Sequence, residues 1–157
     1  MRLTAQEEYG LRCLLQVARG QGGAMTTPEI AEREGLTQAH VHKLMRLLRR
    51  GGLVKSARGR QGGYQLARPA EQINVGHALA SLGGRLYSTS FCGQHTGNER
   101  TCVRNADCSI RSLWRAVDQA VQRALQKTQL TDLLRSEPEM DAWIRSQPEA
   151  FPLRTLS

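Results

Sequence analysis

Three cysteines lie within a single short stretch, from Cys92 to Cys108, with the spacing Cys-x9-Cys-x5-Cys. Only one other cysteine, Cys13, occurs in the 157 residues. The glycine, asparagine and aspartate residues between the three favour a loop over a helix or strand, so the sulfur atoms can turn inward around a common point. The sequence therefore predicts a metal site in this loop, with the other segments arranged on either side of it.

Composition and charge indicate the compartment in which the protein works and the kind of partner it binds. The sequence has no apolar run of membrane-span or signal-peptide type, so we expect a cytoplasmic protein whose thiols stay reduced and available to a metal. The net charge is +8, and residues 1–70 account for +7 of it. Two Phe, three Tyr and two Trp are too few for a surface that stacks single-stranded bases. The first half of the chain is therefore predicted to bind duplex DNA.

Capping signals define the helices of this first half. Thr4 and Glu7 have the spacing of a capping box, and leucines at helical period then predict a helix to about Arg19. In its first turn Glu8 is placed to pair with Arg12. Cys13, in the middle of this helix, is interpreted as a small core residue.

Two further short helices follow, separated by Gly35. The first runs from Pro28 to Glu34, and Thr37 caps the second. The second has an apolar stripe of Val41, Leu44, Met45 and Leu48 and an opposite polar face. This is the pattern of a helix-turn-helix whose second helix enters the major groove. Its predicted DNA-binding residues are Thr37, the base-edge candidates Gln38, His42 and Lys43, and the phosphate-binding candidates Arg46, Arg49 and Arg50.

A β-hairpin with a glycine-rich tip is predicted next. Residues 53–56 and 64–67 read as strands on either side of the loop 57–63. A hairpin directly after a recognition helix is a wing, in which Arg58 and Arg60 can reach phosphates or a narrow minor groove, with Tyr64 as a further DNA-contacting candidate. The alternative is a basic loop that is simply solvated.

The second half contains a helix capped by Asn74 and, after the cysteine loop, the longest periodic segment of the chain. This segment carries its apolar stripe from Ile110 to about Lys127, which is more apolar surface than so small a chain can cover, so we predict that the helix pairs with its copy in a second subunit. The fold class is thus mainly α with a small β-hairpin wing. The predicted parts are a winged helix-turn-helix DNA-binding domain (1–84), a cysteine-rich cluster-binding loop (85–108), a dimerisation helix (109–135) and a C-terminal tail (136–157).

Taken together, these features resemble the family of winged-helix regulators that includes the iron-sulfur assembly regulator IscR and the nitric-oxide sensor NsrR. The matching residues are the opening MRLT with Tyr9, the helix-turn-helix ending LLRRGGLV, the wing RGRQGGYQLAR, and the three cysteines followed by Leu113-Trp114. The resemblance covers about residues 1–135. It implies a homodimeric transcription regulator, not an enzyme, in which Cys92, Cys102 and Cys108 bind an iron-sulfur cluster.

The sequence departs from that pattern at two places. The first gap is longer than the Cys-x5-Cys-x5-Cys typical of the best-known members, and Arg111 stands where the IscR-like branch has a ligating His. A guanidinium has no free lone pair for a metal. The NsrR-like branch implies instead an acidic fourth ligand from the partner subunit, which is Glu8 here, and favours a 4Fe-4S cluster over a 2Fe-2S cluster. His95, an exogenous thiol or water remain alternatives.

On this interpretation the protein is a repressor that binds imperfect palindromes in promoter DNA and responds to nitric oxide, iron or redox state. Changes at the cluster are expected to move Cys108, which lies at the start of the long helix. This movement would change the relative orientation of the two recognition helices. The alternatives are structural zinc held by the three cysteines and His95, a cluster-free regulator controlled by a protein partner or by thiol oxidation, and a thiol-redox enzyme using Cys102 and Cys108. The last is disfavoured because the sequence has no Cys-x-x-Cys.

Overall fold

The structure is a computed structural model that describes residues 3–20, 22–57, 62–83 and 90–151. The head of the molecule contains helices α1 (Ala5–Arg19), α2 (Thr27–Glu34), α3 (Gln38–Arg50) and α4 (Val75–Leu82), and strands β1 (Val54–Ala57) and β2 (Gly63–Leu66). A 3-10 turn, η1 (Ala70–Gln72), joins the hairpin to α4. The fold class is confirmed as a mostly helical winged helix-turn-helix with a two-stranded antiparallel wing.

Local signals in the sequence explain these helices. Thr4 and Thr26 each form a complete capping box, and Thr37 and Asn74 each accept a hydrogen bond from a backbone N–H of the first turn that follows. Gly35 ends α2 with a φ of +65°, a left-handed conformation that glycine adopts without steric cost. The caps therefore set the starts of all four helices of the head.

The hairpin register pairs Val54 with Leu66 and Ala57 with Gly63, one residue away from the predicted strand limits. Gly63 has a φ of +143°, and a Cβ there would lie 2.8 Å from the Met25 carbonyl oxygen. Strand β2 also forms a bridge with Met25 through Tyr64, whose N–H donates to the Met25 carbonyl at 2.8 Å. The segment before α2 therefore closes the free side of the wing.

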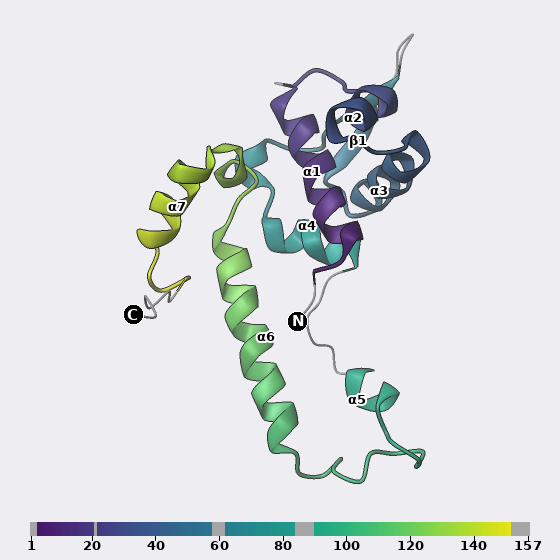
Figure 1. The fold of residues 1–157 in the computed structure, drawn as a ribbon, viewed down its shortest axis with the longest axis vertical. Helices are drawn as coiled ribbons and strands as arrows, with labels where there is room; N and C mark the ends of the chain where they lie inside the picture. Colours follow the sequence, from purple (N-terminus) through teal and green to yellow (C-terminus); the bar gives the residue numbers. More distant parts are fainter. Residues whose placement is uncertain (1–2, 21, 58–61, 84–89, 152–157) are drawn as a thin grey trace.

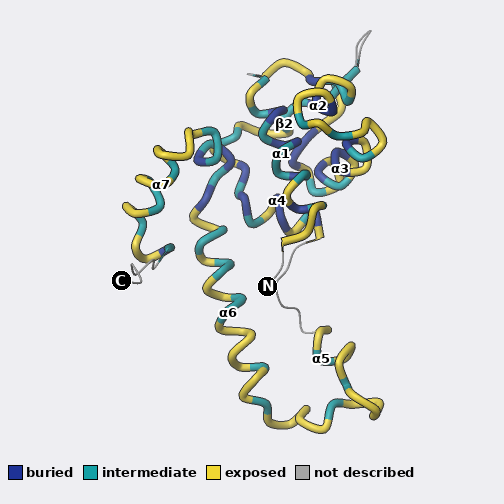
Figure 2. The backbone as a smooth tube through the Cα atoms, in the orientation of Figure 1, coloured by how far each residue is buried: buried dark blue, intermediate teal, exposed yellow. Residues whose placement is uncertain are grey.

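The core lies between α1, α3, α4 and the base of the hairpin. Its largest fully buried side chains are Leu14, Val17, Ile30, Val41, Leu44, Met45, Leu48, Leu53, Val54, Ile73, Leu82 and Leu130. Gly10 allows α4 to approach α1, because a Cβ at this position would collide with Leu82. Figure 2 shows this buried region concentrated in the head and in residues 128–132, whereas residues 90–127 are exposed or intermediate.

Much of the second half of the chain extends away from this head. A short helix, α5 (Ser90–Gln94), and the cysteine loop lie at the far end of α6 (Ser109–Lys127), and α6 runs back to the head as an isolated rod (Figure 1). The C-terminal end of α6 lies beside Asn74, whose side-chain amide donates to the carbonyl of Gln126 at 2.8 Å. The Val75 N–H donates to the Thr128 carbonyl at 3.0 Å, so the end of α6 is fixed beside the start of α4.

The structure departs from the sequence-based expectations at three segments. Cys92 lies in α5 rather than in an irregular loop, because His95 stacks on Phe91 with a centroid separation of 4.1 Å and stabilises one helical turn. The predicted dimerisation helix (109–135) is shorter than expected, because α6 ends at Lys127 and a separate 3-10 turn, η2 (Asp132–Leu134), follows it. The predicted tail (136–157) contains a further helix, α7 (Glu137–Arg145), where the sequence predicted none. Among the described residues no helix is long and apolar enough to cross a bilayer.

Candidate functional site

Helix α3 presents a continuous polar face to solvent. Opposite its four buried residues, every predicted DNA-contacting residue of the helix is exposed, namely Gln38, His42, Lys43, Arg46, Arg49 and Arg50. Thr37 is also exposed, and its hydroxyl accepts a hydrogen bond from the His40 N–H at 3.3 Å. Its cap therefore fixes the end of α3 that would enter a DNA groove first.

A polar contact from α1 braces the turn between α2 and α3. The Arg12 guanidinium forms an ion pair with Glu34 at 2.6 Å and also donates to the Glu34 backbone carbonyl at 3.0 Å. The bond to Glu34 raises the pKa of Arg12 above its ordinary value. The sequence predicted that Arg12 pairs with Glu8, but in the structure Arg12 forms its ion pair with Glu34. This contact joins the first helix to the C-terminus of α2.

The base of the wing is tied to α3 and its following turn. Arg49 donates to the Ser56 hydroxyl at 3.2 Å, and Arg68 donates to the Gly52 carbonyl at 3.1 Å. Tyr64, a predicted DNA contact, is only 8% exposed and belongs to the core, because strand alternation turns it inward against the head. Arg58 and Arg60, at the predicted wing tip, lie outside the described residues.

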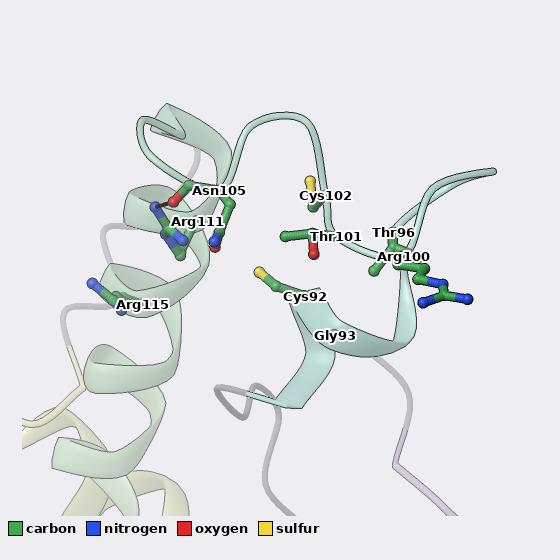
Figure 3. A pocket seen from close by; sticks show the side chains of 9 residues that line it. All are labelled: Cys92, Gly93, Thr96, Arg100, Thr101, Cys102, Asn105, Arg111 and Arg115. Carbon is green, nitrogen blue, oxygen red and sulfur yellow. Dashed lines mark hydrogen bonds between the residues drawn. The ribbon is translucent and has the colours of Figure 1, made fainter.

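A pocket of about 330 Å³ lies between the cysteine loop and the first turns of α6. Cys92 from α5 and Cys102 from the loop line it, together with Arg111 and Arg115 from α6 (Figure 3). All four cysteines of the chain are thiols rather than disulfides. The fold thus places two of the three predicted ligands around one cavity.

Cys108 is the N-cap of α6. Its sulfur accepts a hydrogen bond from the Arg111 N–H at 3.4 Å, the role that a Ser or Thr oxygen usually has at a helix start. The Arg111 side chain donates to the Asn105 carbonyl at 2.9 Å, which ties the second half of the loop to the same turn (Figure 3). The third sulfur therefore lies at the end of the helix where backbone N–H groups favour negative charge.

The two side chains considered as a fourth ligand lie in different parts of the chain. Glu8 is exposed on α1, in the head, and His95 has its Nδ1 2.8 Å from the Phe91 carbonyl oxygen. Among the described residues, no group of three His, Cys, Asp or Glu side chains forms a ready metal cage. Half-buried thiols are the right donors for iron and sulfide, so the residues fit the group by their chemistry, although one chain alone does not close the site.

Cys13 is different from these three. It is fully buried in the core, and burial raises the pKa of its thiol to about 12. A thiol that stays protonated is neither a ready nucleophile nor a ready ligand. The interpretation of Cys13 as a core residue is confirmed.

Two residues of the pocket were not recognised as functional from the sequence. Arg115 was assigned only to the long helix, and Arg111 was considered only as the replacement of a ligand. A signal was nevertheless present, because Arg111 and Arg115 follow the helix-capping Cys108 at three and seven residues. At 3.6 residues per turn, this spacing places both on the helix face that begins at the cysteine.

The fold and the exposed face of α3 define the class of the protein as a winged helix-turn-helix transcription regulator. The chain belongs to the Rrf2 family, described as iron-dependent transcriptional regulators, whose model matches residues 3–136. It is 35% identical over 136 residues to protein rrf2 of Nitratidesulfovibrio vulgaris, covering 86% of this chain and 88% of that protein. To the HTH-type transcriptional regulator IscR of Cronobacter sakazakii it is 30% identical over 151 residues, covering 96% and 90%.

Solved structures agree with this family. The chain is similar to T. potens IscR with a TM-score of 0.66 and 31% identity, over 85% of this chain and 86% of that one. It is similar to CymR (YrzC), the global cysteine regulator of B. subtilis, with a TM-score of 0.67 and 28% identity, over 85% and 96%. Because these relatives are transcription regulators, the prediction that the chain is not an enzyme is confirmed.

Proposed function

We propose that this regulator is a homodimer that binds an iron-sulfur cluster through Cys92, Cys102 and Cys108 and represses promoters with imperfect palindromes. The observation that supports it most directly is the cysteine pocket, where two thiols share a cavity and the third caps the adjacent α6. The family description as iron-dependent regulators supports iron over zinc.

The cluster, when bound, would supply a charge that depends on oxidation and on small ligands such as nitric oxide. Cys108 links the site to the fold, because its sulfur accepts the Arg111 N–H that begins α6. A change in the electron density of this sulfur changes the first turn of α6, and Asn74 ties the opposite end of the helix to the head. The chain thus has a continuous physical connection between thiols and recognition helix.

Anaerobic purification tests the cluster. We expect brown protein with about four iron and four sulfide per protomer, as for a 4Fe-4S cluster, and colourless, iron-free protein when Cys92, Cys102 and Cys108 are replaced by Ala. Cys13→Ala is the matched control, because it removes a thiol outside the loop. Zinc in place of iron in the wild-type protein would contradict the proposal and favour a structural metal site.

Glu8 is proposed as the fourth ligand, donated by the partner subunit. The observation behind this role is its exposed position on α1, where a second protomer can reach it. Glu8→Ala is expected to change the visible and Mössbauer spectra of anaerobic protein, whereas Glu32→Ala, on the exposed face of α2, is expected to leave them unchanged. Identical spectra for the wild type and Glu8→Ala would remove Glu8 from the site.

The dimer is proposed from the surface of α6, which has no buried residue along its 19 positions. Ile110, Leu113 and Trp114 are 54%, 57% and 44% exposed, and adjacent large apolar side chains on one helix are the usual mark of an interface. Two protomers paired through α6 would carry two α3 helices, as a palindromic site requires. Sedimentation equilibrium that finds only monomers at micromolar concentration would contradict this part of the proposal.

Contact of α3 with DNA is tested by salt dependence. Arg46→Gln is expected to weaken binding to promoter duplexes uniformly and to lower the salt slope by about one, as for the loss of one phosphate contact. Gln38→Ala is expected to relax sequence preference instead. Arg123→Gln, exposed on α6, is the matched control. An Arg46→Gln variant with the wild-type salt slope would remove this residue from the interface.

A further inference from the structure

Two arginines of α6 form one wall of the cysteine pocket. Arg111 and Arg115 are four residues apart, so they lie on the same face of the helix, one turn from each other. In Figure 3 the Cys92 sulfur points across the cavity toward α6, on the side where Arg111 lies, whereas Arg100 extends away from the cavity. The hydrogen bond to the Asn105 carbonyl, at 2.9 Å, holds the Arg111 guanidinium in place. The cavity therefore has fixed positive charge opposite a thiol.

Nothing in the lining neutralises this charge. None of the nine lining residues is acidic. Residues 90–115 contain four Arg against one Glu and one Asp, and the two ion pairs given by the described residues involve neither Arg111 nor Arg115. A cavity lined by one sign of charge concentrates small ions of the opposite sign.

We propose that this pocket is an anion-selective entrance to the thiols, which admits small carboxylate-bearing disulfides and presents them to Cys92 and Cys102. The cavity volume of about 330 Å³ is within the range of small-molecule sites. Arginine binds carboxylates through two parallel hydrogen bonds, so the wall positions the anion as well as attracting it. The Thr101 hydroxyl and the Asn105 amide, also in the lining, offer further hydrogen bonds.

The reaction of such a disulfide is a thiol-disulfide exchange. The cysteine gives its proton to solvent, and its thiolate attacks one sulfur of the small disulfide. A new sulfur-sulfur bond forms to the protein while the old one breaks, and the second half of the small molecule leaves as a thiolate with the bonding electron pair. The protein thiol is oxidised and the leaving sulfur is reduced, so the bound disulfide is itself the oxidant.

Two disulfide probes of opposite character test the proposal on the reduced, metal-free full-length chain. Dithiobis(nitrobenzoate) is a dianion, and dithiodipyridine is neutral. Arg111→Gln and Arg115→Gln are each expected to slow the reaction of the dianion roughly threefold to tenfold, the effect of one charge in a partly solvated site. The neutral probe is expected to change less than about twofold, because access to the thiols is retained.

Matched variants distinguish an effect of lost charge from an effect of altered loop structure. Arg111→Lys and Arg115→Lys are expected to restore most of the dianion rate, and Arg123→Gln, outside this pocket, is expected to leave both rates unchanged. Peptide mass spectrometry is expected to find the first label on Cys92 or Cys102. Equal slowing of both probes would show loop loosening and overturn the proposal, as would an unchanged dianion rate or a first label on Cys108 alone.

The outcome is independent of iron, because no metal is present in this measurement. If the variants showed no selectivity between the charged and the neutral probe, the proposed anion-selective entrance would be wrong, and the proposed iron-sulfur site would be unaffected. Failure to bind iron would leave the entrance standing as the feature that decides which small molecules reach the thiols.

Discussion

Helices α3 and α6 carry similar apolar stripes on otherwise charged sequences, yet α3 is packed into the core and α6 is not. Helix α3 buries Val41, Leu44, Met45 and Leu48, whereas α6 is longer and buries nothing. The difference lies in their surroundings, because α3 packs against α1, α2 and α4, while α6 contacts the head mainly at its C-terminal end near α4. An apolar stripe therefore predicts burial, but not whether the same chain provides the covering surface.

The sharpest test of this comparison is a pair of truncations. Leu44→Ala is expected to lower the free energy of unfolding by about 2–5 kcal/mol, because it leaves a cavity in a closed core. Leu113→Ala, on α6, is expected to lower it by less than about 1 kcal/mol when the protein is dilute enough to be monomeric. Urea denaturation measures both. Equal losses would show that α6 is covered within its own chain.

Self-association is the second test. Leu113→Asp is expected to raise the dimer dissociation constant by about a hundredfold, or roughly 2.7 kcal/mol, because a carboxylate in an apolar interface has no partner. Analytical ultracentrifugation over a concentration series measures this shift. Glu137→Asp, on the exposed surface of α7, is the control with no expected change. An unaltered dissociation constant would place the contact elsewhere on the molecule.

The third test concerns alkaline pH and Cys13. Burial raises the pKa of this thiol from 9.0 to about 12, so between these values the unfolded chain loses a proton that the folded chain keeps. Stability must therefore fall as pH rises above 9, by about 2 kcal/mol at pH 10.5 from this group alone. Cys13→Ala is expected to remove that part of the pH dependence, measured as the difference in slope between the two unfolding profiles. Parallel profiles would contradict the assignment.

The smallest expected effect is at the cap of α3. Thr37→Ala is expected to reduce stability by about 1 kcal/mol, because the His40 N–H loses its acceptor. Thr37→Asn keeps a capping oxygen and is expected to change stability by a few tenths of a kcal/mol at most. Thermal unfolding distinguishes the two variants. The same loss in both would show that the hydroxyl contributes through something other than the cap.

Local signals made the head predictable from the sequence. The capping residues Thr4, Thr37 and Asn74 act within one turn of themselves, so their roles could be read without knowing the tertiary structure. The same kind of signal was present at Ser136, where a capping box and Pro138 begin α7, but the other prolines of the tail obscured it. Such motifs determine where a helix starts even when they say nothing about what it packs against.

The site was less predictable, because its geometry depends on contacts between segments. The short helix at Cys92 depends on the stacking of His95 on Phe91, and the assignment of Tyr64 to the core depends on Met25, far away in sequence. The wall formed by Arg111 and Arg115 exists only because the loop folds back over the first turns of α6. Sequence identifies the thiols, whereas the charges around them follow from the fold.

The pairing of the Val75 N–H with the Thr128 carbonyl fastens the end of α6 to the start of α4, so the chain that continues after α4 returns to the same helix. The cysteine loop lies at the far end of this closed path (Figure 1). Extra residues there add little closure entropy, since each doubling of a flexible loop costs only about 0.6 kcal/mol. The nine residues between Cys92 and Cys102 can therefore be lengthened or shortened at little cost to the stability of the head.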